Sequence, residues 1–178
     1  MPSSPTWYPA TIARLPRPQA ALLRETGSFT RALGRACGES PRVRLLDQGW
    51  GRPRGAEIRA LALAEGRFGL IRRVELHCGV EPVFARTVIP PATIAARPGL
   101  ARMGERALGA ALFADPAVER GRLEVARLEP GAALHAEAGG GEGPRWARRS
   151  LFRVGGQALL VCEVLPPLEG GDGTMRPR

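Results

Sequence analysis

Alternation of hydrophobic and polar positions marks two neighbouring strands in the middle of the chain. From Leu70 to Cys78 the apolar residues fall mainly on every second position. This period of two is typical of a β-strand with one face toward a core and the other toward water. A second strand, Val83 to Ile89, follows the turn Gly79 to Pro82, and it ends at Pro90 because proline cannot donate to a strand ladder. The pattern predicts an antiparallel hairpin.

The other predicted elements are short. Helical patterns occupy Pro18 to Glu25, Ser28 to Arg35 and, as two pieces, Gly99 to Phe113. Strand patterns occupy Val43 to Leu46, Glu57 to Leu63, Arg122 to Leu128, Arg148 to Val154 and Gln157 to Leu165. Successive strands without a βαβ rhythm predict the α+β class, an antiparallel sheet flanked by short helices. We expect one domain over residues 1–167, a flexible glycine-rich insertion over residues 136–144 and a disordered tail over residues 168–178.

Two charged residues disagree with this pattern. Glu163 lies within the apolar run Ala158 to Leu165, which reads as a strand buried on both faces, and a buried carboxylate is costly without a partner. Arg72 lies on the apolar side of its strand, whereas the neighbouring Arg73 points to the solvent-facing side. Two interpretations fit these outliers. Arg72 and Glu163 form a buried salt bridge, or they are two walls of a pocket for an anionic ligand.

The charge of the chain invites a nucleic-acid interpretation, which the distribution of that charge weakens. The formal net charge is +9, and all 26 basic residues are arginine. The arginines are scattered, aromatic residues are few, and no helix-turn-helix, RNA-recognition or zinc-finger pattern occurs. We therefore predict no nucleic-acid partner, and we expect the positive field to favour anionic small molecules.

The cysteines and histidines indicate no metal site. Cys37, Cys78 and Cys162 cannot all pair, and we interpret them as reduced packing residues of a cytoplasmic protein. No Cys/His cluster offers metal ligands, and His77 and His135 are interpreted as surface residues. No stretch approaches a membrane span, and the N-terminus lacks a signal pattern. We predict a monomer without a membrane span.

Three segments together carry a family resemblance. The first runs from Arg72 to Pro90 and contains the sequence ARTVIP, and the second is ALGAALF at residues 107–113. The third begins with WARRS at residues 146–150 and continues as GGQALLVCEVLP to Pro166. In order and spacing, the chain from about Leu70 to Pro167 resembles the chorismate pyruvate-lyases of bacterial ubiquinone synthesis. The N-terminal third matches loosely, chiefly through Ser28-Phe29-Thr30.

The resemblance implies a fold, a reaction and a set of residues. It implies an antiparallel sheet enclosing an internal ligand cavity, and conversion of chorismate to 4-hydroxybenzoate and pyruvate without a cofactor. Arg72 would bind the ring carboxylate, helped by the backbone amides of Leu108 and Phe29. Glu163 would meet the 4-hydroxyl. Three proton routes stay open: Glu163 only accepts a hydrogen bond, Glu163 helps to take the C4 proton, or the proton moves within the substrate.

Other arginines are second-rank candidates. The turn after the first hairpin strand is about one residue shorter than the usual family form, so Arg73 is a backup to Arg72. Arg86 could line a substrate entry path, and a solvated strand-edge arginine fits the pattern equally well. Arg148 and Arg149 point to opposite sheet faces, so at most one of them is expected to face the pocket.

A ligand-binding domain of the same fold is the main alternative to the enzyme. Such domains serve as effector sensors in some bacterial transcription regulators, where they follow a winged-helix domain. A winged-helix domain would need roughly 65 residues, near the smallest size that folds alone. None precedes the predicted sheet, so we favour the enzyme. A basic interaction domain is a further alternative, and it would show salt-dependent DNA binding instead of product formation.

Overall fold

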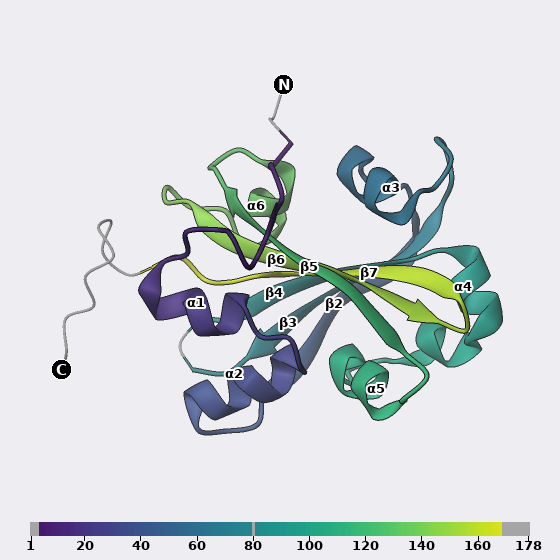
Figure 1. Ribbon diagram of the computed structural model, residues 1–178, viewed down its shortest axis with the longest axis horizontal. Helices are drawn as coiled ribbons and strands as arrows, with labels where there is room; N and C mark the ends of the chain where they lie inside the picture. The colour runs from purple at the N-terminus through teal and green to yellow at the C-terminus, as the bar shows by residue number, and fades with distance from the viewer. Residues whose placement is uncertain (1–3, 80, 169–178) are drawn as a thin grey trace.

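The computed structural model describes residues 4–79 and 81–168 and has one antiparallel sheet at its centre (Figure 1). The strand order is β1-β5-β6-β7-β4-β3-β2. The strands are β1 (Tyr8–Pro9), β2 (Arg42–Gly51), β3 (Gly69–His77), β4 (Val83–Ile89), β5 (Glu119–Leu128), β6 (Arg145–Val154) and β7 (Gln157–Val164). Every neighbouring pair is antiparallel, which confirms the α+β class.

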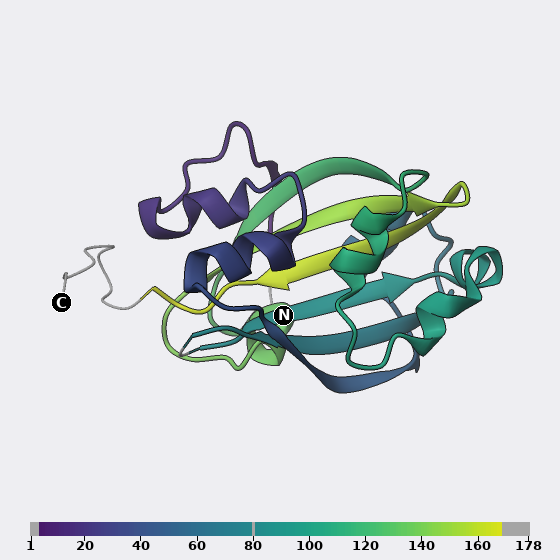
Figure 2. The same cartoon turned by 90° about the horizontal axis from the view of Figure 1, so that it is seen from below.

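Short helices cover both faces of the sheet. They are α1 (Arg17–Leu23), α2 (Phe29–Cys37), α3 (Gly55–Leu61), α4 (Pro91–Ala96), the 3-10 helix η1 (Pro98–Arg102), α5 (Leu108–Ala114) and α6 (Ala133–Glu137). Helices α1, α2 and α5 lie over one face, and α3 and α6 lie over the other (Figures 1 and 2). No helix in the described ranges is long and apolar enough to cross a membrane.

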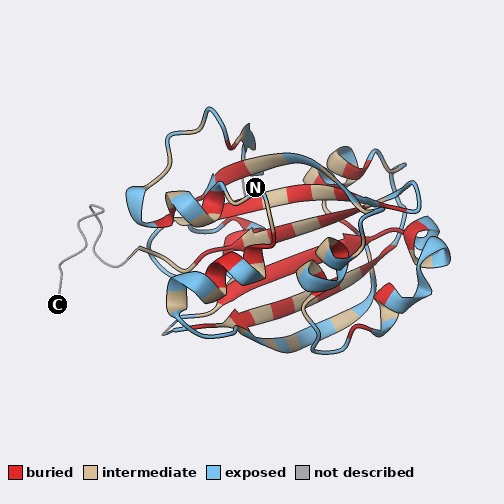
Figure 3. Ribbon diagram, turned by 60° about the horizontal axis from the view of Figure 1, so that its bottom comes forward, coloured by how far each residue is buried: buried red, intermediate tan, exposed pale blue. Residues whose placement is uncertain are grey.

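The apolar face of each helix is buried against the sheet. Leu23, Phe29 and Leu33 of α1 and α2 pack with Val74 and Leu76 of β3. Buried residues form red bands along the sheet in Figure 3, and every residue of the central strand β4 is buried. Strand β3 follows the predicted alternation, because its buried positions alternate with half-buried ones from Leu70 to His77.

Several predicted elements are confirmed. Ser28 caps α2, since its hydroxyl accepts a hydrogen bond from the Arg31 amide. The segment Gly99 to Phe113 is divided into η1 and α5, as the two glycines within it suggested. The hairpin between β6 and β7 turns at Gly155 and Gly156, both of which have positive φ.

Other predictions were wrong. The predicted strand Glu57 to Leu63 is largely helix α3, which Ala, Glu and Arg favour and which the Glu57 carboxylate caps by accepting from the Arg54 amide. Helix α4 and strand β1 were not predicted. The insertion over residues 136–144 begins inside α6, and side chains hold it in place, because His135 contacts the Gly143 carbonyl and Arg145 donates to that of Gly140. His135 is therefore buried rather than at the surface.

The cysteines also differ from expectation. Cys37 at the end of α2 and Cys78 after β3 are joined by a disulfide, with 6.0 Å between their α-carbons. The prediction of three reduced cysteines was wrong because α2 folds back onto the end of β3, which brings residues 41 positions apart into contact. Cys162 is free and buried. Most of the tail predicted to be disordered, residues 169–178, lies outside the described residues.

Candidate functional site

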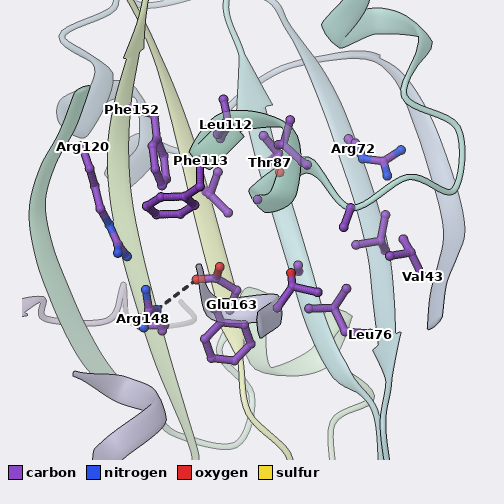
Figure 4. Close-up of a pocket in the computed structure, with 18 of the residues that line it drawn as sticks. Val43, Arg72, Leu76, Thr87, Leu112, Phe113, Arg120, Arg148, Phe152 and Glu163 are labelled. Atoms are coloured by element: carbon purple, nitrogen blue, oxygen red, sulfur yellow. Dashed lines mark ion pairs between the residues drawn. The ribbon is translucent and has the colours of Figure 1, made fainter. Parts of the chain in front are cut away.

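A cavity lies between the sheet and helices α2 and α5 (Figure 4). Strands β2 to β7 supply its floor, and the first residues of α2 and α5 lie over it. The cavity has a volume of about 40 Å³. One water molecule needs about 10–15 Å³ on the same measure. The ionisable residues in its wall are Arg72, Arg120, Arg148 and Glu163. Both residues that the pattern marked as outliers therefore face the same cavity.

Arg72 is buried without a counterion. Its side chain is 2% exposed and forms no ion pair with any residue that the structure describes. The guanidinium donates to the carbonyls of Gly104 (2.6 Å) and Arg106 (3.1 Å), in the loop between η1 and α5. Gly104 has a φ of 55°, which glycine adopts readily. Burial lowers the pKa of Arg72, because a charge is less stable away from water. A ligand anion would relieve this cost.

Glu163 pairs with Arg148, not with Arg72. These two residues are direct neighbours on β7 and β6, and the Arg148 Nε lies 3.2 Å from the Glu163 Oε2. Arg72 lies on the same sheet face two strands away, since Arg72 is opposite Thr87 and Glu163 is opposite Ala85. Adjacent strands are about 4.8 Å apart and each residue rises about 3.4 Å, so the α-carbons of Arg72 and Glu163 are roughly 12 Å apart. The cavity occupies the space between their side chains.

Arg120 and Arg148 occupy the end of the cavity away from Arg72 (Figure 4). Arg148 is fully buried, and its guanidinium lies 5.0 Å from the centre of the Phe29 ring. Arg120 lies over the rings of Phe113 and Phe152, at 5.7 Å and 5.4 Å. Burial, together with the nearby charge of Arg148, lowers the pKa of Arg120 to about 10. Three guanidinium groups against one carboxylate give the wall a formal charge of +2.

Phe29 and Leu108 are the first residues of α2 and α5, and both line the cavity. The first amides of a helix have no acceptor within the helix. Neither amide donates to a backbone carbonyl elsewhere in the described ranges. Two backbone N–H groups are thus free to meet a ligand at the cavity.

The chain matches the chorismate lyase family over residues 1–168. It belongs to this family. A relative from Halorhodospira halophila, named probable chorismate pyruvate-lyase, is 40% identical and covers 97% of this chain and 95% of its own length. A relative of the same name from Methylococcus capsulatus is 40% identical over 80% of this chain and 91% of its own length. One from Pseudomonas aeruginosa strain UCBPP-PA14, again with this name, is 39% identical over 94% of both chains.

A solved structure shares the fold of this family member. The effector domain of PhnF from Mycobacterium smegmatis superposes with a TM-score of 0.56, over 80% of this chain and 90% of that one. The sequences are 18% identical, so the likeness concerns the fold alone.

The second-rank arginines lie elsewhere, apart from Arg148. Arg73 is on the opposite sheet face, where it is paired with Asp47. Arg86 is also on that face, and its buried guanidinium is paired with Glu57 at 2.7 Å and 3.1 Å. Arg149 lies over the Trp7 ring and donates to Glu124. Arg148 and Arg149 therefore do face opposite sides of the sheet, and Arg148 is the one in the cavity.

Arg120 was missed by sequence reasoning. The predicted strand began at Arg122, whereas β5 begins at Glu119 and its register shifts between Arg120 and Leu123. Such an irregularity interrupts the alternation of faces, so the side on which Arg120 lies could not be read from the sequence.

Proposed function

We propose that this protein converts chorismate to 4-hydroxybenzoate and pyruvate, without a cofactor, in the cavity between the sheet and helices α2 and α5. The observation that carries the proposal is the charge of the cavity wall. Three buried or half-buried guanidinium groups face one carboxylate, and chorismate is a dianion. Family membership supports the same reaction, because the relatives are named probable chorismate pyruvate-lyases.

Arg72 binds the ring carboxylate in this proposal. Its planar guanidinium can form two parallel charge-assisted bonds, and the two loop carbonyls that it already contacts fix its orientation. The free amides of Phe29 and Leu108 add donors without a competing positive side chain. All three groups converge on the cavity, and together they would hold the ring in one orientation.

Glu163 meets the 4-hydroxyl at the other end of the ring. The carboxylate and the 4-hydroxyl are on opposite ends of the chorismate ring, and Arg72 and Glu163 are likewise separated by strand β4. In the reaction the ether bond at C3 breaks and its electron pair leaves with the enolpyruvyl group. The C4 proton is lost, the ring becomes aromatic, and enolpyruvate gains one proton to become pyruvate. Aromatisation makes the reaction downhill, so positioning and charge stabilisation suffice.

The decisive experiment follows both products at once. Purified protein is incubated with chorismate, and pyruvate is measured by an enzyme-coupled assay while 4-hydroxybenzoate is measured by chromatography. We expect the two to form in equal amounts. Pyruvate without the aromatic product, or neither product, would reject the proposal. The cytoplasmic location, the monomeric state and a role of the product in ubiquinone synthesis remain predictions from the sequence and the family resemblance.

A second candidate is a non-catalytic effector-binding domain. The fold shared with the effector domain of PhnF favours it as the alternative. It predicts binding of 4-hydroxybenzoate or chorismate in calorimetry with no product formed. Turnover in the assay above excludes it.

A further inference from the structure

Two arginines at the far end of the cavity have no role in binding the ring. Arg120 of β5 and Arg148 of β6 lie on the cavity face of the sheet, beside Glu163 and away from Arg72 (Figure 4). Arg148 has a relative exposure of 0%, and Arg120 lies against two aromatic rings. Arg148 is buried and Arg120 is half-buried, so these two adjacent cations repel each other and lose hydration, and their placement together requires a compensating partner.

The protein supplies only part of that compensation. The Nη1 of Arg148 donates to the carbonyls of Leu22 (2.7 Å) and Glu25 (2.9 Å). Its Nη2 is buried and has no partner among the described residues, and its Nε is near Glu163 without hydrogen-bond geometry. An unpaired buried donor is costly.

Arg120 has hydrogen bonds but no carboxylate partner in the part of the chain that the structure describes. Its Nε donates to the Ser150 hydroxyl at 3.0 Å. Its Nη1 donates to the carbonyls of Glu25, Thr26 and Gly27, of which Thr26 is nearest at 2.6 Å. These contacts fix the position of the guanidinium but all go to neutral oxygen atoms, and the nearest carboxylates, Glu163 and Glu25, act on its charge only from a distance. Glu163 is the only carboxylate among the described residues that line the cavity, and it is shared with Arg148.

We propose that Arg120 and Arg148 form a second anion subsite, which binds the carboxylate of the three-carbon enolpyruvyl side chain. The inference rests on the proposed function. The side chain is attached at C3, next to the C4 hydroxyl that Glu163 meets, and Arg148 is the direct cross-strand neighbour of Glu163. A ring held by Arg72 and Glu163 therefore brings the side chain to the end of the cavity that holds the two arginines.

The subsite has a consequence for specificity. When the ether bond breaks, the leaving enolpyruvate keeps its carboxylate, and the developing negative charge on its oxygen forms close to the two cations. The aromatic product lacks that carboxylate and binds only through the Arg72 end and through the contact of its 4-hydroxyl with Glu163. Dicarboxylates should therefore bind more tightly than monocarboxylates of the same ring.

A pair of inert ligands tests this without turnover. We would measure, by calorimetry, the binding of 3-(1-carboxyvinyloxy)benzoate, which carries both carboxylates, and of 3-methoxybenzoate, which carries only the ring carboxylate. We expect the wild-type protein to prefer the dicarboxylate by about 10- to 100-fold, the range for a charge-assisted hydrogen bond. In Arg120→Gln this preference should fall to a few-fold at most, with 3-methoxybenzoate bound as before.

Arg122→Gln is the matched control, because it removes the same charge from an exposed position two residues along the chain. Arg148→Lys, which keeps the charge but loses the planar group, should weaken the dicarboxylate selectively and covers the case in which Arg120→Gln fails to fold. The inference is overturned if the wild-type protein does not prefer the dicarboxylate, or if Arg120→Gln weakens both ligands equally. A clear preference for the dicarboxylate in a protein that does not turn over chorismate would reject the lyase function and keep the subsite.

Discussion

The Glu163 carboxylate lies 3.2 Å from Arg148, while Arg72 stands two strands away across the cavity. Glu163 and Arg72 therefore do not neutralise each other, and the cavity between them stays open. The ion pair of Glu163 and Arg148 is itself part of the cavity wall, so any ligand that contacts Glu163 also meets a cation. The carboxylate that would contact the ring hydroxyl is therefore next to a cation that could meet the negative charge of the departing enolpyruvyl side chain.

The first prediction concerns the chemical role of Glu163. Glu163→Ala should lose most lyase activity, because no other carboxylate in the described part of the chain lines the cavity. Glu163→Ala leaves Arg148 without its counterion, and so does the Glu163→Gln variant of the next paragraph. We therefore expect both variants to have a lower midpoint of thermal unfolding than the wild-type protein. Steady-state kinetics with chorismate, run at a temperature where each variant is folded, gives the comparison.

Glu163→Gln separates the two protein roles that remain open for this residue. A glutamine keeps an oxygen that accepts from the 4-hydroxyl but cannot take a proton at neutral pH. Retention of a tenth or more of the wild-type kcat would indicate a hydrogen-bond role, and loss equal to that of Glu163→Ala would indicate proton transfer. Wild-type turnover in Glu163→Ala would remove Glu163 from the site.

A second prediction concerns the planar group of Arg72. Arg72→Lys should weaken 4-hydroxybenzoate binding by about 10- to 100-fold, since an ammonium cannot hold two loop carbonyls and a carboxylate in one plane. Calorimetry measures the change. Arg73→Lys, one position along on the opposite sheet face, provides the control and should bind as the wild-type protein does. Equal affinity in Arg72→Lys and the wild-type protein would place the ring carboxylate elsewhere.

The positions of Arg72 and Glu163 were readable from the sequence because Arg72 interrupts the apolar stripe of an alternating strand and Glu163 interrupts a continuous apolar run. A charge on an apolar stripe is visible whenever the stripe is unbroken, as it is from Leu70 to Cys78. The strand order is required to predict that both residues face one cavity, because strand β4 lies between them. No local pattern contains that order.

Other features depend on contacts that are distant in sequence. Residues Glu57 to Leu61 are too few to distinguish strand from helix by periodicity, and the buried pair of Glu57 and Arg86 joins residues 29 positions apart. The disulfide likewise depends on how α2 folds back toward the end of β3. Arg120 was hidden by the irregularity in β5. Local patterns thus predicted the strands and missed the pairings between them.

A third prediction concerns the disulfide. Cys37 and Cys78 join the C-terminal end of α2 to the end of β3, and the first residue of α2 lines the cavity. Reduction, or Cys37→Ser, should lower the free energy of unfolding by about 2–4 kcal/mol, because the unfolded chain loses a constraint. Thermal unfolding with and without reductant measures this effect.

The buried Cys162 supplies the control for the disulfide. Cys162→Ala should still lose stability on reduction, as the wild-type protein does, because it retains the pair. Cys37→Ser should no longer respond to reductant. A wild-type unfolding midpoint that is the same in both conditions would contradict the assignment.

The last prediction concerns the rate of product release. Helices α2 and α5 contact each other over the cavity, and a Cβ at Gly109 of α5 would lie 3.6 Å from the Thr30 hydroxyl of α2. The product would leave only when these glycine-flanked helices separate, while Arg72 still holds its carboxylate by charge-assisted bonds. Release should therefore be slower than the chemical step.

In a rapid-quench experiment with excess chorismate, we expect a burst of about one 4-hydroxybenzoate per protein before the slower steady state. Arg72→Lys, with weaker retention, should show a smaller burst and a less inhibitory product. Linear product formation from the first turnover in the wild-type protein would show that chemistry, or a step before it, limits the rate.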